Sequence, residues 1–532
     1  MRSRHTRLFL AVGVVFLTLS IASAQYQNVR VSLPSASDPE EVSISINPAN
    51  TLNLAAGANI DYYYYSTNGG LNWTQGRLTS TYGVWGDPCL VFDKSGNLYF
   101  VHLSNPPSQG YWIDRIVVQK STNGGATWNA GAGIGFRPPN AQQDKAWLAA
   151  DIQRPPRAST IYVSWTDFDS YGSTSTSDSS RIRLSRSTDY GITWSDPVRV
   201  SDRAGDCLDE DNTVEGAVPA IGPNGEVYVA WSGPLGIMFD KSTDHGVTFG
   251  QDIFVSDQPG GWDFMIPGIY RCNGLPITAC DVSESPYRGN IYVNWSDQRN
   301  GLGNTDVFIA KSTDAGATWS APIRVNDDIT TTQQFFTWMT VDQMTGNVYA
   351  VFYDRRATSG NATDVYVARS TDGGETFSNF KVSQSSFSPT SGVFFGDYTN
   401  VAAYNGKVYP IWMRLDGSVL SVWTALVYDT VSTTGVPPEE GHASSFALLQ
   451  NYPNPFNPST MIRFDVRASE HVTLKVFDLL GREVATLVDQ VVDPGEHTVV
   501  FSAWDYKLSS GTYFYRMTAG SFTQTRKFVL LE

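Results

Sequence analysis

An eight-residue motif that occurs six times constrains the fold of this chain more than any other feature. Its copies begin at Ser66, Ser121, Ser187, Ser242, Ser312 and Ser370. In every copy the third residue is Asp or Asn, the fifth is Gly and the eighth is Trp or Phe. A motif that returns at similar intervals through most of a chain indicates a fold built from repeated units.

Each octapeptide has the composition of a tight turn between two strands. Apolar runs such as RIVVQK and DVFIAK precede the copies, and short runs such as PVRVS and PIRVN follow them. Asp or Asn at the third position can accept hydrogen bonds from the backbone of its own turn, and Gly can adopt the positive φ angle that such a turn needs. We therefore expect a structural role for the six third-position residues. These are Asn68, Asn123, Asp189, Asp244, Asp314 and Asp372.

Two more strand-like runs lie upstream of the run that precedes each turn. With the run that follows the turn, each repeat is predicted to form four short antiparallel strands, which is the blade of a β-propeller. The six octapeptides give six blades, and residues 395–428 add a seventh with only three strands. The run QNVRVSL at 27–33 matches the fourth strands of other repeats and can complete this last blade, which also pairs an open sheet edge. The sequence thus predicts an all-β, seven-bladed propeller over residues 25–430, with six blades as the alternative.

The octapeptide resembles the Asp box, also called the bacterial neuraminidase repeat, which occurs in sialidases and in many other propellers. The resemblance implies that the turns are structural and lie on the face opposite an active site. Sialidases bind the substrate carboxylate with three arginines, the first in an Arg-Ile-Pro motif. This sequence contains no Arg-Ile-Pro, since VRVSLP and GFRPPN both differ from it. The resemblance therefore implies the fold and leaves sialidase activity in doubt.

The two ends of the chain predict export. Residues 1–24 have the pattern of a secretory signal peptide, with Arg2, Arg4 and Arg7 before an apolar run and Ala22-Ser23-Ala24 as the cleavage site. No later apolar run approaches the ~20 residues of a membrane-spanning helix, so we expect no integral membrane segment after signal removal. The net charge of −15 disfavours nucleic acid or an anionic membrane as partner.

The composition changes near the C-terminus. A Pro- and Gly-containing linker at 431–446 is followed by alternating runs such as HVTLKVFD and GTYFYRMTA, which predict a small Ig-like β-sandwich over residues 447–532. The stretches NYPNPFNPST, LKVFDLLGREVATLV and SSGTYFYRM resemble the type A sorting domain of the type IX secretion system. This resemblance implies secretion across the outer membrane by the type IX machinery, with the protein then attached to the cell surface or released.

Four cysteines are few for this length, so disulfides are not expected to form the scaffold. Cys272 and Cys280 lie close in sequence, and we predict a disulfide between them in an oxidising compartment. Cys89 and Cys207 can pair only if the fold brings them together.

Acidic residues recur where the chain enters the first strand of a repeat, on the face opposite the octapeptides. The candidate catalytic residues are Asp87, Asp144, Glu215, Asp263 and Asp397. Paired carboxyl groups suit glycoside hydrolysis, arginines can bind an anionic sugar, and aromatic rings can stack on sugars. The candidate ligand-binding residues are Arg299, Arg355, Arg414, Trp147, Trp262, Trp338 and Tyr398.

Several functions are compatible with these residues. The first hypothesis is a glycan-directed binding or scaffold module without conventional sialidase chemistry, whose partner is a glycan or surface polysaccharide. The alternatives are an exo-α-sialidase or other glycoside hydrolase, and a protein-binding propeller. Whether the chain is an enzyme stays open. No cofactor is required, although the acidic run DCLDEDN has the oxygen ligands that suit Ca²⁺.

Overall fold

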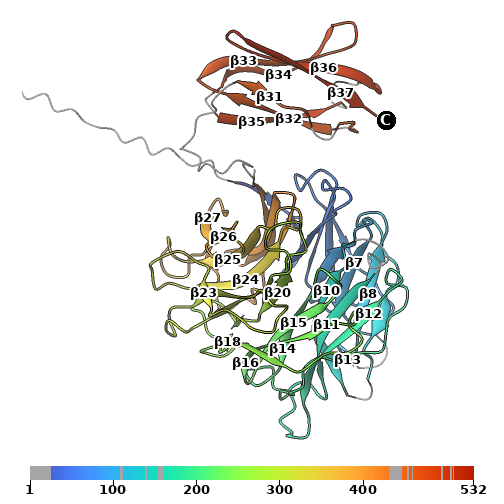
Figure 1. Ribbon diagram of the computed structural model, residues 1–532, viewed down its shortest axis with the longest axis vertical. Coiled ribbons are helices and arrows are strands. Elements are labelled where there is room, and N and C mark those ends of the chain that lie inside the picture. Colours follow the sequence, from blue (N-terminus) through green and yellow to red (C-terminus); the bar gives the residue numbers. More distant parts are fainter. Residues whose placement is uncertain are drawn as a thin grey trace, which may run out of the picture. The chain divides into compact units, whose positions relative to one another are not determined.

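The chain divides into two compact units, Met1–Val431 and Ser432–Glu532 (Figure 1). The computed structural model describes residues 26–107, 112–137, 140–153, 160–429, 446–451, 454–457, 459–492, 495–503, 506 and 508–531. The expected signal peptide and all but the last residue of the expected linker lie outside the described residues. Among those described, no helix has the length and apolar character needed to cross a bilayer.

The described part of the first unit contains seven four-stranded antiparallel sheets. In six of them the strands lie side by side in chain order, and in the seventh one strand comes from the other end of the unit. The first has β2 (Ser43–Ile46), β3 (Leu54–Ala58), β4 (Tyr62–Ser66) and β5 (Thr74–Arg77). The second has β6 (Cys89–Phe92), β7 (Leu98–Leu103), β8 (Ile116–Ser121) and β9 (Ala132–Ile134). The third has β10 (Gln142–Ala150), β11 (Ile161–Phe168), β12 (Ser180–Ser187) and β13 (Val198–Arg199). The fourth has β14 (Glu215–Ile221), β15 (Val227–Gly233), β16 (Gly236–Ser242) and β17 (Ile253–Ser256).

A two-stranded sheet, β18 (Asp263–Phe264) and β19 (Cys272–Asn273), precedes the fifth four-stranded one. The fifth has β20 (Ile277–Cys280), β21 (Ile291–Asp297), β22 (Asp306–Ser312) and β23 (Ile323–Arg324). The sixth has β24 (Gln334–Val341), β25 (Val348–Asp354), β26 (Asp364–Ser370) and β27 (Ser378–Lys381). The seventh has β28 (Asn400–Tyr404), β29 (Lys407–Asp416), β30 (Val419–Tyr428) and β1 (Gln27–Arg30).

The first strands of these sheets contact one another in a closed order. β2 packs against β6, β6 against β10, β10 against β14, and β14 against β20. β20 then packs against β24, β24 against β28, and β28 against β2. The first strands therefore surround a common central channel, and the fourth strands lie farthest from it.

The strand nearest the N-terminus completes the last sheet, as predicted. β1 pairs antiparallel with β30, with Gln27 opposite Leu426 and Arg30 opposite Trp423. The side chain of Asn28 also donates to Val382 O at 2.8 Å and accepts from Gln384 N at 2.8 Å, which ties β1 to the sixth sheet. One strand thus joins the two ends of this unit.

The six octapeptides are hairpin turns between the third and fourth strands, as the sequence predicts. In the copy that begins at Ser312, Asp314 Oδ1 accepts from Ser312 Oγ at 2.8 Å and from Thr318 N at 2.9 Å, while Thr318 Oγ1 donates to Oδ2 at 2.6 Å. Gly316 has a φ of +80°, and a Cβ atom there would lie 2.4 Å from the ring of Phe239 in the preceding sheet. The Gly is therefore required both by the turn and by its contact with the neighbouring sheet.

The second unit is also built from strands. One sheet has β31 (Ala447–Leu448), β32 (Ser459–Val466) and β35 (Gly495–Ser502). The other has β34 (Glu483–Val492), β33 (Glu470–Phe477), β36 (Gly511–Ala519) and β37 (Phe522–Leu530). Side chains from both sheets, including Phe464, Leu474, Tyr515 and Phe528, form one buried apolar core. Two sheets around one core are the arrangement of a β-sandwich.

The predicted disulfide between Cys272 and Cys280 is wrong, because all four cysteines are free and buried. Cys272 begins β19 and Cys280 ends β20, so the chain between them includes an extended strand. An extended chain advances about 3.3 Å per residue, which carries the two thiols apart despite their closeness in sequence.

Candidate functional site

The acidic residues lie at the edge of the sheets opposite the octapeptide turns. In the third sheet Gln142, the first residue of β10, pairs with Phe168, the last residue of β11. Ser187, which ends β12 and begins an octapeptide, pairs with Ile161 at the other end of β11. The starts of the first strands are therefore on the face that the sequence predicted for function.

Bulges interrupt the starts of three first strands. The strand register shifts between Asp144 and Trp147 in β10, between Glu215 and Val218 in β14, and between Phe335 and Trp338 in β24. Within the first of these bulges, Lys145 has a φ of +48°. A residue other than Gly in this conformation is strained, and such bulges commonly re-aim side chains near functional sites.

The result is a cavity of about 130 Å³ at this end of the channel, which we call the acidic cavity. It is lined by Asp144, Lys145, Tyr171, Asp209, Glu215, Trp262, Asp263, Arg271, Cys272, Asn273, Leu275 and Asp397. Four of the five predicted acids are thus brought together. The fifth, Asp87, lies beside them, since its Oδ2 accepts from Lys145 N at 3.2 Å.

Asp263 reaches the cavity by a different route from the one predicted. The sequence placed it at the start of a first strand, but the first strand of its sheet is β20, which begins at Ile277. Asp263 instead lies on β18, in the small two-stranded sheet that precedes β20, and is exposed. An inserted hairpin therefore carries this acid into the site.

Asp397 is held by both of the cations that line the cavity. Lys145 Nζ lies 2.7 Å from Asp397 Oδ2, and Arg271 binds both carboxylate oxygens, with its Nε 2.8 Å from Oδ1. Burial would by itself raise the pKa of Asp397, but Lys145 and Arg271 hold this pKa well below its usual range. Lys145 Nζ is also 3.7 Å from Glu41 Oε1 and 3.9 Å from Asp87 Oδ2. Asp397 is therefore ionised, and both cations are already paired.

Glu215 has the opposite electrostatic environment. Its side chain is fully buried, and neither carboxyl oxygen has a hydrogen-bond donor among the described residues. Burial, and then repulsion from Asp209 and Asp144, raises the pKa of Glu215 well above its usual value. Burial, followed by repulsion from Asp87, also raises the pKa of Asp144. The cavity therefore combines two carboxyl groups whose pKa is raised, Glu215 and Asp144, with one whose pKa is lowered, Asp397.

Three of the predicted aromatic residues lie in the channel below the acidic cavity, pack against one another and do not line that cavity. The rings of Trp147 and Trp338 have centroids 4.2 Å apart, and those of Trp147 and Tyr398 are 5.0 Å apart. All three side chains are buried. We therefore correct their predicted role from ligand binding to packing. The fourth, Trp262, does line the cavity, and its Nε1 donates to Thr213 O at 3.3 Å.

None of the three predicted arginines lines the acidic cavity, because each is bound to partners of its own. Arg299 Nε lies 2.9 Å from Asp297 Oδ1, and Arg414 Nε lies 2.7 Å from Asp416 Oδ2. Arg355 is buried and donates to Pro267 O at 2.9 Å. Two of them follow or precede an Asp by two residues, which favours a local ion pair over a free binding group.

The sequence prediction missed the cations and the aromatic ring that face the acids. Lys145 follows Asp144 directly, so alternation along a regular strand would place it on the other side, and only the bulge brings it into the cavity. Arg271 comes from the inserted hairpin. Tyr171 lies beyond the end of β11, and its hydroxyl donates to Asp209 Oδ2. Proximity to Asp144 was the only sequence signal available for Lys145.

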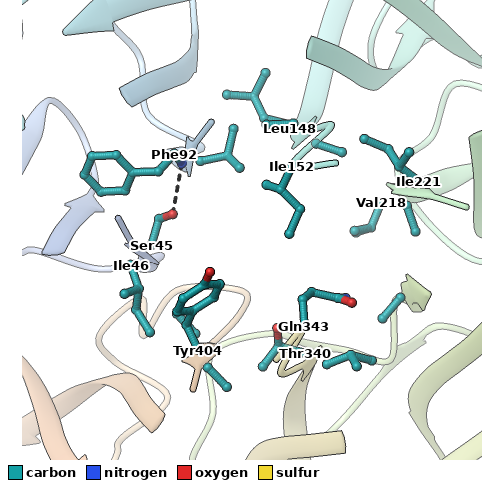
Figure 2. A pocket seen from close by; sticks show the side chains of 18 of the residues that line it. Ser45, Ile46, Phe92, Leu148, Ile152, Val218, Ile221, Thr340, Gln343 and Tyr404 are labelled. Atoms are coloured by element: carbon teal, nitrogen blue, oxygen red, sulfur yellow. Dashed lines mark hydrogen bonds between the residues drawn. The ribbon is translucent and has the colours of Figure 1, made fainter. Parts of the chain in front are cut away.

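A second cavity, of about 290 Å³, occupies the channel on the other side of Trp147 and Trp338 (Figure 2). Ile46, Phe92, Leu148, Val218 and Ile221 are among the residues that line this cavity, and its walls are mainly apolar. Ser45 there is already bonded, since its Oγ accepts from Phe92 N at 3.1 Å. Among the described residues, no group of three or more His, Cys, Asp or Glu is arranged to hold a metal ion.

Comparison with known proteins identifies the C-terminal unit. Residues 450–531 match the family described as "Secretion system C-terminal sorting domain". The chain therefore carries a C-terminal sorting domain of the type IX secretion system, which engages the secretion machinery. This domain directs the protein across the outer membrane to the cell surface or the extracellular medium. A search of curated proteins found no match to the chain.

Solved structures with a similar arrangement include two sialidases and a lyase. A Hadza microbial sialidase is 16% identical with a TM-score of 0.41, and the match covers 72% of this chain and 75% of that chain. The NanB sialidase from Streptococcus pneumoniae is 9% identical with a TM-score of 0.44, covering 71% and 83%. A PL25 ulvan lyase is 11% identical with a TM-score of 0.44, covering 74% and 95%. Identities this low carry no information about chemistry.

Proposed function

We propose that the first unit is a seven-bladed β-propeller. The proposal is supported by the seven four-stranded sheets and by the closed order in which their first strands pack. A six-bladed ring would leave one of these sheets outside that order. The pairing of β1 with β30 supplies the closure that an antiparallel ring needs to avoid an open edge.

We further propose that the acidic cavity binds a glycan and lacks conventional sialidase chemistry. The observation that carries this proposal is that Lys145 and Arg271 are both bound to Asp397. Recognition of a sialic acid carboxylate requires cationic donors that are free to bind it, usually a bidentate guanidinium. Here an anionic sugar would have to displace Asp397 and would also face Asp209 and Asp263.

A neutral sugar suits the same cavity better. Its hydroxyl groups can donate to the ionised carboxylate of Asp397, and they can accept from Glu215 and Asp144 when these carboxyl groups, whose pKa is raised, are protonated. Tyr171 and Trp262 supply aromatic surface among these polar groups. A few placed polar groups combined with aromatic walls are typical of small-molecule sites.

Titration calorimetry of the purified chain with neutral and sialylated oligosaccharides tests this proposal. We expect binding of at least one neutral glycan and none of its sialylated form. The Asp397→Asn variant should weaken binding at least tenfold, because Lys145 and Arg271 lose their shared partner and the site loses an acceptor. Asp489→Asn, an exposed acid of the second unit, is the matched control. Preferential binding of the sialylated form would contradict the proposal.

A second candidate function, glycoside hydrolysis, is favoured by the opposite pKa shifts of Glu215, whose pKa is raised, and Asp397, whose pKa is lowered. Glycosidases use one protonated carboxyl group as the acid and one ionised group as nucleophile or base. Release of reducing sugar from the same panel of glycans would support it, provided that Glu215→Gln abolishes turnover while Asp489→Asn does not. Absence of turnover on every glycan that binds would leave the binding function alone.

A further inference from the structure

A row of aromatic rings continues from the acidic cavity onto the surface of the first unit. Tyr171 lines the cavity, and its ring centroid lies 5.4 Å from that of Trp112. The Trp112 centroid is in turn 6.2 Å from that of Trp85. We call Tyr171, Trp112 and Trp85 the aromatic strip. Its members come from three different connections, before β6, between β7 and β8, and after β11, all on the face that bears the acids.

The two tryptophans keep large apolar surfaces in solvent. Trp85 is 39% exposed and Trp112 is 38% exposed, whereas Trp147, Trp165, Trp231, Trp295, Trp338 and Trp412 are buried. Isolated exposed apolar residues are common, but adjoining aromatic rings that lead into a polar cavity are characteristic of binding surfaces. The side chains of Trp85 and Trp112 are therefore not part of the buried core between the sheets.

Hydrogen bonds of the backbone and of Tyr171 hold the strip in place. Trp85 N donates to Leu103 O at 2.9 Å, and Ile113 N, which follows Trp112, donates to Ser104 O at 3.0 Å. The hydroxyl of Tyr171 donates to Asp209, another residue that lines the cavity. A ligand that contacts these rings would therefore pay little to order them.

We infer that the aromatic strip is a second binding subsite, which contacts further sugar units of a chain whose end occupies the acidic cavity. This inference rests on the proposed glycan function and deepens it, since it makes the ligand a neutral oligosaccharide or polysaccharide rather than a single sugar. The apolar faces of sugar rings pack on aromatic rings, while their hydroxyl groups stay in water at the exposed edge. The strip accordingly adds affinity only for ligands that are long enough to leave the cavity.

Calorimetric titration of the full chain with gluco-, galacto-, manno- and xylo-oligosaccharides of one to six units tests this inference. We expect the affinity of the parent chain to rise with length for the sugar it binds. Trp112→Ala and Trp85→Ala should each lower the affinity for the longest oligomer about tenfold, as expected for loss of one aromatic contact. Neither should change binding of the monosaccharide. Trp112→Phe, which retains an apolar ring, should recover part of the affinity.

Tyr190→Ala is the matched control, because Tyr190 is 39% exposed but lies in an octapeptide turn at the opposite face. Circular dichroism and the unfolding temperature show whether each variant is folded. Affinity that does not depend on oligosaccharide length would contradict the proposed subsite and leave the proposed glycan function intact. The same holds if the tryptophan variants lose equal affinity for the monosaccharide and the hexasaccharide. Failure of the parent chain to bind any of these sugars would overturn both.

Discussion

Lys145 is the residue on which the buried charges of the acidic cavity depend. Its ammonium group lies within 4 Å of carboxyl oxygens of Asp397, Glu41 and Asp87. Loss of one partner from a buried ion pair leaves uncompensated charge, so Lys145→Met should lower the free energy of unfolding by about 3–5 kcal/mol. Urea unfolding at pH 7 measures this change. Lys145→Arg keeps the charge and should lose less, whereas equal stability of Lys145→Met and the parent would mean that Arg271 alone compensates Asp397.

Glu40, next to the same cluster, predicts a loss of stability at higher pH. Burial, and then repulsion from Asp38 and Asp397, raises the pKa of Glu40 from 4.5 to about 8. The folded state therefore binds more protons than the unfolded state between pH 4.5 and 8, so this group lowers stability as pH rises through that window. Glu40→Gln should stabilise the protein by about 1–3 kcal/mol at pH 8, after allowance for solvent screening. Parent and variant should have similar stability at pH 4.5, and a constant difference across the window would refute the assignment.

At the residue scale the sequence located the acids but not their electrostatic roles. Asp144, Glu215 and Asp397 could be predicted because each lies at or just before the start of the first strand of its repeat. Nothing in the residue types showed that the pKa of Asp397 would be lowered and that of Glu215 raised. That difference depends on Lys145 and Arg271, which reach the cavity through a bulge and an inserted hairpin. Neither feature has a pattern that alternation of apolar residues reveals.

Among the structural elements, the octapeptide turns give a prediction at low pH. Hydrogen bonds from the Thr318 side chain and backbone, and from Ser312, lower the pKa of Asp314 from 3.8 to about 2. This group therefore contributes stability that is fully present above pH 3.8 and is lost as pH falls toward 2. Asp314→Ala should lower Tm by about 2 °C at pH 7, a difference that shrinks toward pH 2. Calorimetric scans at both pH values measure it.

Asp314→Asn is the control for this turn, since Asn occupies the equivalent position in the first two copies. It retains an acceptor oxygen and should lose less stability than Ala at pH 7. Because the amide does not titrate in this range, its Tm should lack the contribution that Asp314 makes between pH 3.8 and 2. A variant with the same pH dependence as the parent would exclude Asp314 as its source.

The strands and turns were largely predictable, and the departures from regular strands were not. The octapeptide predicted where the hairpin turns lie, because Asp or Asn accepts hydrogen bonds from the backbone of the turn and Gly adopts its positive φ angle. The bulges in β10, β14 and β24 depend on how each first strand fits the channel, and one of them places Phe336 at a φ of +49°. Packing within the ring overrides local preference at these points.

For the whole first unit, the pairing of β1 with β30 predicts a strong effect of a short deletion. Removal of residues 26–33 would leave one edge of β30 unpaired and would also remove the contacts of Asn28 with Val382 and Gln384. We expect a lower unfolding temperature and a less cooperative transition, measured by calorimetry. Arg30→Ala, which preserves the backbone of β1, is the control and should be close to the parent. Equal stability of the deletion variant would show that β1 does not close the ring.

At this scale the repeats in the sequence were enough to predict the seven sheets and the strand that completes the last one. The disulfide prediction failed because closeness in sequence was used in place of position in the fold. Cys272 faces the acidic cavity, while Cys280 lines the apolar cavity at the other side of Trp147 and Trp338. The extended strand β20, which lies along the channel, separates residues that a loop would have kept together.

The pairing of β1 with β30 also fixes the order of events when the chain folds. Gln27 pairs with Leu426, so the first described strand has no partner until nearly all of the first unit is present. Pairing between such distant segments is slow to form, and the entropy of closing so long a loop must be met before the contact contributes. In an exported protein, this late pairing limits the compartment in which the fold can be completed. The ring cannot close while β30 is still on one side of a membrane that β1 has already crossed, so the finished fold can exist only in a compartment that holds both ends.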